Sequence, residues 1–431
     1  MPPVYNPGQT MPSFSSNRAR RLTQLLGLAA AAWLGVAGIR KTLVGWWSLS
    51  DNPDNWRRAV RLDPSDANLW WRIGLLEQWD FSRANSRQAL EDLERAARLN
   101  PHAAPIWLDL AMAYEAGGKV QQAAEAYRRA REAFPRSADV SWQYGNFLLR
   151  QGKPELAAAS VQRALQVHPE LLMTALGEFA RAGYPPAWLV EHVLPPQPSA
   201  ALRAVEFFLA QGDLDGALLA WGRAVSQQAP VPLPQSVGLV TALLNGHRFA
   251  AARTAWQQAL QMAGIALPDE RQPVYNGDFE RDPLNGGFDW HLEQAPGVRV
   301  ELDPVVTCSG HRSVRLRFDG TQNVAFQHVY ELVPVRPGAR YRLRACVRTQ
   351  GLTTDQGIWL AVTPVDQPDR ILGATSPLTG TQPWHEVEAE LTVCSECPVV
   401  VLSIRRSPSS HLDNQIAGTA WVDRVRLEAM E

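Results

Sequence analysis

The sequence of 431 residues contains few cysteines and almost no net charge. All four cysteines lie in the last third of the chain, so disulfides cannot staple the whole chain together. A formal net charge of −1 excludes a global attraction to nucleic acid, and we expect no nucleic-acid partner. Hydrophobic residues make up 45% and charged residues 20%, which is typical of globular proteins. The length predicts two or three domains.

Short motifs of common catalytic sites are also missing. The sequence has no Gly-x-Ser-x-Gly, phosphate-binding loop or dinucleotide fingerprint, and no carboxylate pair is marked as general acid and base. Cys394 and Cys397 form a CxxC pair without a second pair at zinc spacing. Together with Cys308 and Cys346 they allow three disulfide connectivities, which stay open. We therefore predict that the protein is not an enzyme.

Residues 1–21 contain no acidic residue, and the run Leu22–Ile39 contains no charge of either sign. As a helix, this run would extend about 27 Å, near the lower limit for crossing a bilayer. We predict a basic N-terminal tail over 1–21 and a transmembrane or signal-anchor helix over 22–39. The alternatives are a cleaved signal peptide, with Gly35-Val36-Ala37 as the cleavage site, and a soluble buried helix.

We expect the protein to be exported. It would cross the inner membrane once, and the bulk of the chain would be periplasmic or extracellular. Basic residues flank both ends of the apolar run, so charge by itself does not set the orientation.

Self-similarity is the strongest signal in the chain. Pro101, Pro135 and Pro169 follow one another at intervals of 34 residues. Between the first two prolines, small and large residues recur at fixed positions: Trp107, Leu110, Ala111, Tyr114, Gly118, Ala123, Tyr127 and Ala130. The next interval repeats the pattern with Tyr144, Gly145, Leu148, Gly152, Ala157, Val161 and Ala164. Small residues let two helices approach closely, and proline stops the second helix.

This pattern resembles the tetratricopeptide repeat family. The resemblance implies roughly five helical hairpins over 51–266 and a concave face that binds a peptide segment of a protein partner. Positions of this sequence that match the family's groove include Trp71, Leu108, Met112, Trp142 and Asn146. The alternative is that several of these side chains only pack against a neighbouring hairpin.

From about Pro268 onward, strict alternation replaces helical spacing. Val314, Leu316 and Phe318 alternate with polar residues, and similar runs cover 340–347 and 386–391. Period-two runs bounded by Gly, Pro and Asn predict an antiparallel sandwich of eight to ten strands. Rows of arginine (340, 342, 344) and glutamate (386, 388, 390) could pair across a solvent face, or the arginines could grip an acidic polymer.

Three stretches of this region resemble a second family: Asn276–Glu280, Gly310–Leu316 and Trp421–Leu427. In this order they are similar to the jelly-roll, galactose-binding-like carbohydrate-binding modules found beside cellulases and xylanases. The resemblance covers 272–429 and implies glycan binding, with sugar rings stacked on exposed aromatic side chains. Candidates for stacking are Trp290, Trp359, Tyr330 and Trp384. Trp384 opens a strand and is better explained as a core residue, whereas Trp290 in Gly-Gly-Phe-Asp-Trp is the first choice.

The same resemblance implies a structural calcium near the terminal strands. Asp423 alternates in step with Trp421 and Val425, so it should lie on the same, otherwise apolar face of the strand. Its carboxylate should therefore be buried, and a buried carboxylate needs a partner. Glu280 on the opening stretch could share a calcium ion with it. The alternative is a hydrogen bond to loop backbone.

Together these patterns predict a multidomain protein: an all-α tetratricopeptide solenoid followed by an all-β jelly-roll sandwich, with an N-terminal transmembrane or signal helix. The expected function is a membrane-anchored exported scaffold that binds a protein partner and a polysaccharide, in a setting such as exopolysaccharide assembly or export. The alternatives are a protein-interaction module that binds no sugar and a glycan-active enzyme with its site in the sandwich.

Overall fold

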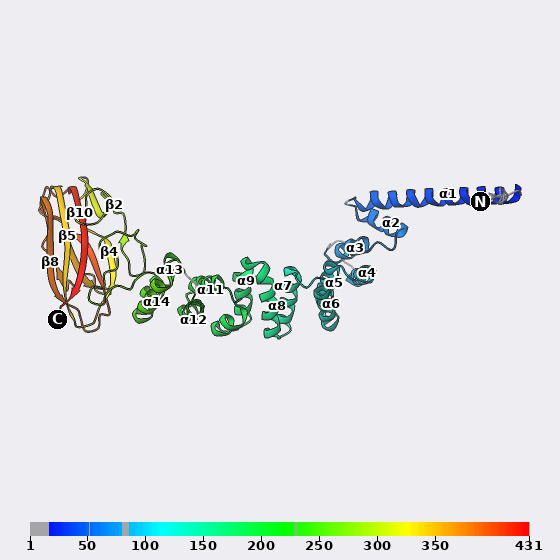
Figure 1. Ribbon diagram of the computed structural model, residues 1–431, viewed down its shortest axis with the longest axis horizontal. Coiled ribbons are helices and arrows are strands. Elements are labelled where there is room, and N and C mark those ends of the chain that lie inside the picture. Colours follow the sequence, from blue (N-terminus) through cyan, green and yellow to red (C-terminus); the bar gives the residue numbers. More distant parts are fainter. Residues whose placement is uncertain (1–16, 51, 80–85, 229–230, 431) are drawn as a thin grey trace, which may run out of the picture. The chain divides into compact units, whose positions relative to one another are not determined.

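The computed structural model describes residues 17–50, 52–79, 86–228 and 231–430 (Figure 1). The chain falls into two compact units, one ending at Leu171 and one beginning at Leu172. The first unit is helical, and the second contains further helices followed by a β-sandwich.

In the first unit, consecutive helices pack in pairs: α3 with α4, α5 with α6, and α7 with α8. The helices are α1 (Asn17–Ser48), α2 (Pro53–Leu62), α3 (Ala67–Trp79), α4 (Ser86–Leu99), α5 (Ala104–Ala116), α6 (Val120–Ala133), α7 (Ala138–Arg150), α8 (Pro154–Val167) and the short 3₁₀-helix η1 (Pro169–Leu171).

Two features of the 34-residue pattern explain these pairs. Helices α4, α6 and α8 each end two residues before the repeated proline, which cannot continue a helix. Gly145 lies so close to α8 that an added Cβ would stand 2.7 Å from Cγ2 of Val161. The predicted close approach of the two helices at small residues is therefore confirmed.

Helix α1 contains the one segment among the described residues that is long and apolar enough to cross a membrane, Arg21–Ser48. Its apolar side chains are exposed, and a signal sequence would share this composition. The end of α1 has a different environment, because Val44 is buried in a small core with residues of the following helices: Ala59, Val60, Leu69 and Ile73.

The second unit continues with paired helices, α11 with α12 and α13 with α14. The proline-rich segment after α9 forms a short helix that continues into a π-helix. The elements are α9 (Leu172–Arg181), α10 (Pro186–Trp188), the π-helix η2 (Leu189–Val193), α11 (Pro198–Ala210), α12 (Leu214–Ser226), α13 (Pro234–Asn245) and α14 (Phe249–Met262).

Ten strands then form two five-stranded antiparallel sheets, which confirms the predicted sandwich (Figure 1). One sheet, here called the β4 sheet, has the order β1-β4-β9-β6-β7, and the other, the β5 sheet, has the order β2-β3-β10-β5-β8. The strands are β1 (His291–Leu292), β2 (Val298–Asp303), β3 (Ser313–Asp319), β4 (Phe326–Pro334), β5 (Arg340–Leu352), β6 (Trp359–Pro364), β7 (Gly373–Ala374), β8 (Gly380–Thr392), β9 (Val399–Arg406) and β10 (Ala417–Ala429).

The outer face of the β5 sheet carries the rows of opposite charge. Arg342 lies opposite Glu390 and Arg344 opposite Glu388 in the register of β5 and β8. Nη2 of Arg342 is 2.7 Å from the Glu390 carboxylate, and Nε of Arg344 is 3.3 Å from that of Glu388. Cross-strand pairing of the arginine and glutamate rows is therefore confirmed, and these charges neutralise one another on a solvent face.

Candidate functional site

The outer face of the β4 sheet carries aromatic side chains instead of paired charges. Along β4, Val329 and Val333 point into the core, so Tyr330 between them points outward. Along β6, Leu360 and Val362 belong to the core, and Trp359 takes the opposite parity. Tyr330 and Trp359 thus share one face, and both are partly exposed.

Strand register gives the spacing between the two rings. Ser403 on β9 pairs with Tyr330 on one side and with Ala361 on the other. Trp359 precedes Ala361 by two residues on β6. It is therefore separated from Tyr330 by the width of two strand spacings, from β4 over β9 to β6, and by two residues along the strand direction. Strand spacings of ~4.8 Å and a rise of ~3.3 Å per residue put their Cα atoms about 12 Å apart. Small side chains, Ser403 and Ala361, lie between them but are buried, and the two partly exposed rings together with Arg405 are called the platform below.

Polar neighbours hold both rings in place. The ring of His291 stacks on Tyr330 at 4.5 Å, and the Tyr330 hydroxyl donates to Glu293 over 3.3 Å. Burial and the nearby Glu293 charge raise the pKa of Tyr330. The guanidinium of Arg405 lies 6.0 Å from the Trp359 ring centre, close enough for a cation–π contact.

Arg405 also secures the loop that follows β6. Its Nε donates to the Ser403 hydroxyl over 2.7 Å, and its Nη1 donates to the carbonyl of Pro368 over 3.2 Å. One side chain therefore links the platform to the neighbouring loop.

The structure corrects the first-choice stacking residue. Trp290 is fully buried and packs against Phe279, with ring centres 5.0 Å apart. Its ring belongs to the sandwich core, so it offers no surface to a sugar. Strand β1 begins at His291, and the alternation that places His291 outward turns Trp290 inward.

Glu280 and Asp423 hold one loop from two sides, although they are 143 residues apart. The Asp423 carboxylate accepts the backbone N–H groups of Cys308 and Ser309 at 2.8 and 2.9 Å. Glu280 accepts those of His311 and Arg312 at 2.6 and 3.1 Å. Burial raises the pKa of Asp423, whereas the His311 backbone bond is the main cause of the lowered pKa of Glu280.

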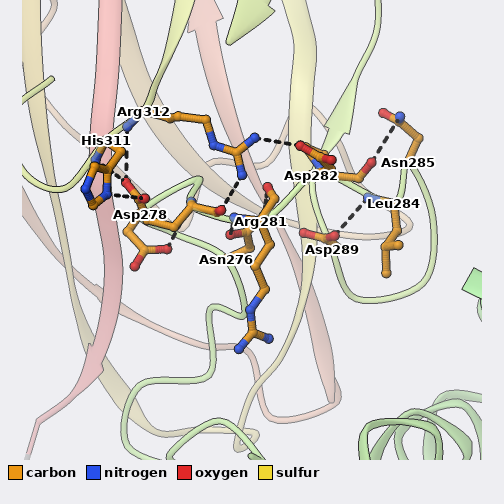
Figure 2. A network of polar contacts seen from close by, with 11 residues as sticks. Asn276, Asp278, Arg281, Asp282, Leu284, Asn285, Asp289, His311 and Arg312 are labelled. Carbon is orange, nitrogen blue, oxygen red and sulfur yellow. Dashed lines mark hydrogen bonds and ion pairs between the residues drawn. The ribbon is translucent and has the colours of Figure 1, made fainter. Parts of the chain in front are cut away.

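A wider polar network surrounds this loop. Figure 2 shows Arg312 turned toward Asp282, with Nη1 2.6 Å from the carboxylate, and Asp289 accepting the backbone N–H of Leu284 over 2.9 Å. A disulfide joins Cys308 to Cys346, and another joins Cys394 to Cys397. The structure thus selects one of the three connectivities that the sequence left open.

The calcium prediction depends on the oxygens of Glu280 and Asp423. Each of these four oxygens receives a hydrogen-bond contact from a backbone N–H or from Nδ1 of His311. A carboxylate oxygen has two lone pairs and can accept a hydrogen bond while it binds a cation, so these contacts are compatible with a bound calcium ion. Among the described residues, the group with three potential metal-ligand atoms in reach of one another is Cys394, Glu396 and Cys397, and its thiols form a disulfide. Calcium stays a prediction.

Sequence reasoning missed two buried carboxyl groups, Glu331 and Asp289. Glu331 is fully buried on β4, and its Oε1 accepts the backbone N–H of Tyr275 over 2.9 Å. Burial raises the pKa of Glu331 well above its ordinary value, and the Asp289 charge adds to the effect. The signal was present in the sequence, because Glu331 has the parity of Val329 and Val333.

The five predicted groove residues all lie on the first helices of successive pairs. Trp71 is on α3, Leu108 and Met112 are on α5, and Trp142 and Asn146 are on α7, and each is partly exposed. Two of them also bridge neighbouring elements. Nε1 of Trp71 donates to Asp109 over 2.7 Å, and Leu108 packs on a cluster formed by Ala104, Ala130 and Val140.

No curated protein matches the chain. Similar solved structures include a CBM4 carbohydrate-binding module (16% identity, 36% of this chain and 99% of that chain, TM-score 0.29). They also include YrrB, described as a tetratricopeptide protein with an unusual peptide-binding site (16% identity, 49% and 94%, TM-score 0.27). A third is PilF of Pseudomonas aeruginosa (20% identity, 47% and 95%, TM-score 0.27).

A family model gives the most specific result. The model described as tetratricopeptide repeat matches residues 81–138 and 108–171. These ranges contain the hairpins α5–α6 and α7–α8 and the 34-residue proline register on which the repeats were predicted. The helical part of the chain therefore contains tetratricopeptide repeats over residues 81–171.

Proposed function

We propose that this protein is a membrane-anchored, exported scaffold that binds a glycan on the outer face of the β4 sheet and a protein segment on its helical repeats. Assembly or export of exopolysaccharide is the setting that such a pair of ligands suggests. Repeats of this family commonly serve as protein-binding surfaces, and similarity to carbohydrate-binding modules supports a sugar ligand.

The observation that carries the glycan proposal is the contrast between the two sheets. Charges on the β5 sheet are paired with one another, whereas Tyr330 and Trp359 present partly exposed rings on the β4 sheet about 12 Å apart. Pyranose rings stack on aromatic faces through their C–H groups, and neighbouring hydroxyls bind polar side chains. Arg405 and His291, both partly exposed, supply polar atoms beside the rings.

The first test is binding of the full-length protein to a panel of soluble polysaccharides. We expect Tyr330→Ala and Trp359→Ala each to weaken binding at least about tenfold, as loss of a buried aromatic contact does. Trp384→Ala is the matched control, because Trp384 is a partly exposed tryptophan on the β5 sheet. Release of oligosaccharide would favour a glycan-active enzyme, and absence of binding would favour an interaction module without sugar.

The protein-binding proposal depends on the partly exposed groove residues of α3, α5 and α7. A photo-crosslinking residue at Met112 should capture a protein partner in cells, whereas the same residue at the exposed Gln121 on α6 should not. Equal capture at both positions would contradict a partner bound on the predicted face.

Export is supported by the two disulfides, because such bonds persist in oxidising compartments. Anchoring is supported by the exposed apolar surface of α1. The test is alkaline extraction of membranes: an anchored chain stays in the pellet, and a chain cleaved after Ala37 is released.

The predicted calcium site is tested by titrating the full-length protein with calcium and measuring its melting temperature. A melting temperature that does not change would refute the calcium site.

A further inference from the structure

The end of helix α1 is part of a packed core that it shares with the helices that follow it. Helix α1 continues nine residues beyond Ile39, and Val44 and Trp47 in this extension pack on α2 and α3. Nη1 of Arg72 on α3 donates to the carbonyl of Ser48 over 2.6 Å, which fixes the end of the helix. A membrane span in α1 would therefore hold the α1–α2 pair directly at the bilayer surface.

Helix α2 returns along α1 toward the predicted span. The two helices pack against each other, with Val44 of α1 in one core with Ala59 and Val60 of α2, and the residue that caps the end of α2 lies near Arg40. This residue, Asp63, shows the proximity: the Ser65 hydroxyl is the main cause of the lowered pKa of Asp63, and the charges of Arg40 and Lys41 lower it further.

Four basic residues are exposed on these two helices. Arg40 and Lys41 are exposed on α1, and Arg58 and Arg61 are exposed on α2. The remaining arginine of α2, Arg57, points elsewhere, with Nη2 2.7 Å from the Glu77 carboxylate on α3. In the part of the chain that the structure describes, no ion pair within 4.0 Å involves Arg58 or Arg61.

The length of the apolar run sets the depth of this cluster. Leu22–Ile39 would extend about 27 Å, close to the ~30 Å hydrocarbon core, so the residues just after Ile39 would lie among the lipid headgroups. Arg58 lies about one helical turn from Arg61, and long basic side chains reach along a surface to place their charge at the headgroups. Trp46, 70% exposed on α1, is a residue type enriched at this interface.

We propose that Arg40, Lys41, Arg58 and Arg61 form a basic collar that binds the anionic phospholipid headgroups of the leaflet next to the helical repeats. This inference rests on the proposed membrane anchoring. The collar would orient the first hairpin on the bilayer and thereby set the direction in which the repeats leave the membrane.

The experiment uses full-length protein in bilayers of phosphatidylcholine and phosphatidylglycerol, with a trace of nitroxide-labelled lipid of either headgroup. The motionally restricted fraction of each label measures which lipid contacts the protein. We expect phosphatidylglycerol to be selected about threefold or more, since basic residues near the surface attract anionic lipid headgroups. Selection should weaken at high salt.

The test variant is Arg58→Gln/Arg61→Gln, which leaves the apolar run and its flanking charges intact. This variant should lower the ratio of phosphatidylglycerol to phosphatidylcholine in contact with the protein toward one. Its melting temperature and its retention in the membrane pellet on alkaline extraction should not change. The matched control, Arg136→Gln/Lys153→Gln, removes two exposed cations between later helices and should keep the selection. Equal selection by test variant and wild type, or none by either, would overturn the collar alone. Release of the wild-type protein by alkali would overturn both anchoring and collar.

Discussion

The backbone N–H of Gly287 donates to Oγ1 of Thr241 over 2.8 Å, and this bond joins the β-sandwich to helix α13. Around it, Trp256 on α14 packs edge-on against Tyr275 and Phe288. Glu270 pairs with Arg336 at 2.6 Å and with Arg253 at 3.4 Å. Gly287 and Phe288 of the Gly-Gly-Phe-Asp-Trp segment thus form part of the contact between the sandwich and the last hairpin.

Gly286→Val should loosen this joint. A Cβ at Gly286 would stand 2.5 Å from Cγ1 of Val237 and 2.9 Å from Oγ1 of Thr241, so the helix must move away. We expect a loss of roughly 1–3 kcal/mol and faster hydrogen exchange in α13 and α14. Gly238→Ala on α13, which has open space around its Cα, is the control. Unchanged exchange in α13 would show that the joint tolerates a side chain there.

Gly145→Val should separate α7 from α8. The added side chain would meet Val161 at 2.7 Å and the Ala157 carbonyl at 3.2 Å, and neither a branched side chain nor a helix backbone yields easily. We expect this hairpin to lose about 2–3 kcal/mol, measured by hydrogen exchange of α7 amides. Gly177→Ala in α9, with nothing within 4 Å, should instead stabilise its helix by up to ~1 kcal/mol.

The two disulfides should contribute unequally to stability. The Cys308–Cys346 disulfide closes a loop whose ends are 38 residues apart in the sequence, whereas the ends of the Cys394–Cys397 loop are only three residues apart. Loop-closure entropy predicts losses of about 4 and about 2 kcal/mol for the respective double serine variants. Urea unfolding of the sandwich, followed by its tryptophan fluorescence, measures both. Equal losses would mean that loop entropy does not govern these bonds.

Asp92 should make the first unit less stable at neutral pH. Burial, followed by the Glu77 charge, raises its pKa to about 6. The folded state therefore binds a proton that the unfolded state has released, and stability falls as pH rises from about 4 to about 6. Asp92→Asn removes the charge, and we expect a gain of about 1 kcal/mol at pH 7.5, after allowance for solvent screening.

Hydrogen exchange of α3 and α4 at two pH values checks this prediction. The wild type and the Asn variant should converge near pH 4, where Asp92 is protonated. Glu155→Gln on α8 is the control, since Glu155 is exposed and lies on another helix pair of the same unit. A stability gain that persists at pH 4 would assign the effect to packing and not to charge.

Several elements were readable from the sequence because local rules decide them. The 34-residue proline interval marks where α4, α6 and α8 end, and alternation marks the strands with their inward residues. The rows of arginine and glutamate were predicted from the alternation of polar and apolar residues along each strand. Trp290 was misjudged because its position next to a short strand gives no local sign of which face it takes.

The sequence by itself determined the repeats, the sandwich and the polar or apolar character of each strand face, since these depend on residues close together in the chain. Only the tertiary structure decided which sheet carries Tyr330 and Trp359 together, because strand order brings β4, β9 and β6 side by side across more than 70 residues. It also decided that Glu280 and Asp423 hold one loop and that two glycines dock on α13. Such contacts depend on long-range packing, which no local pattern encodes.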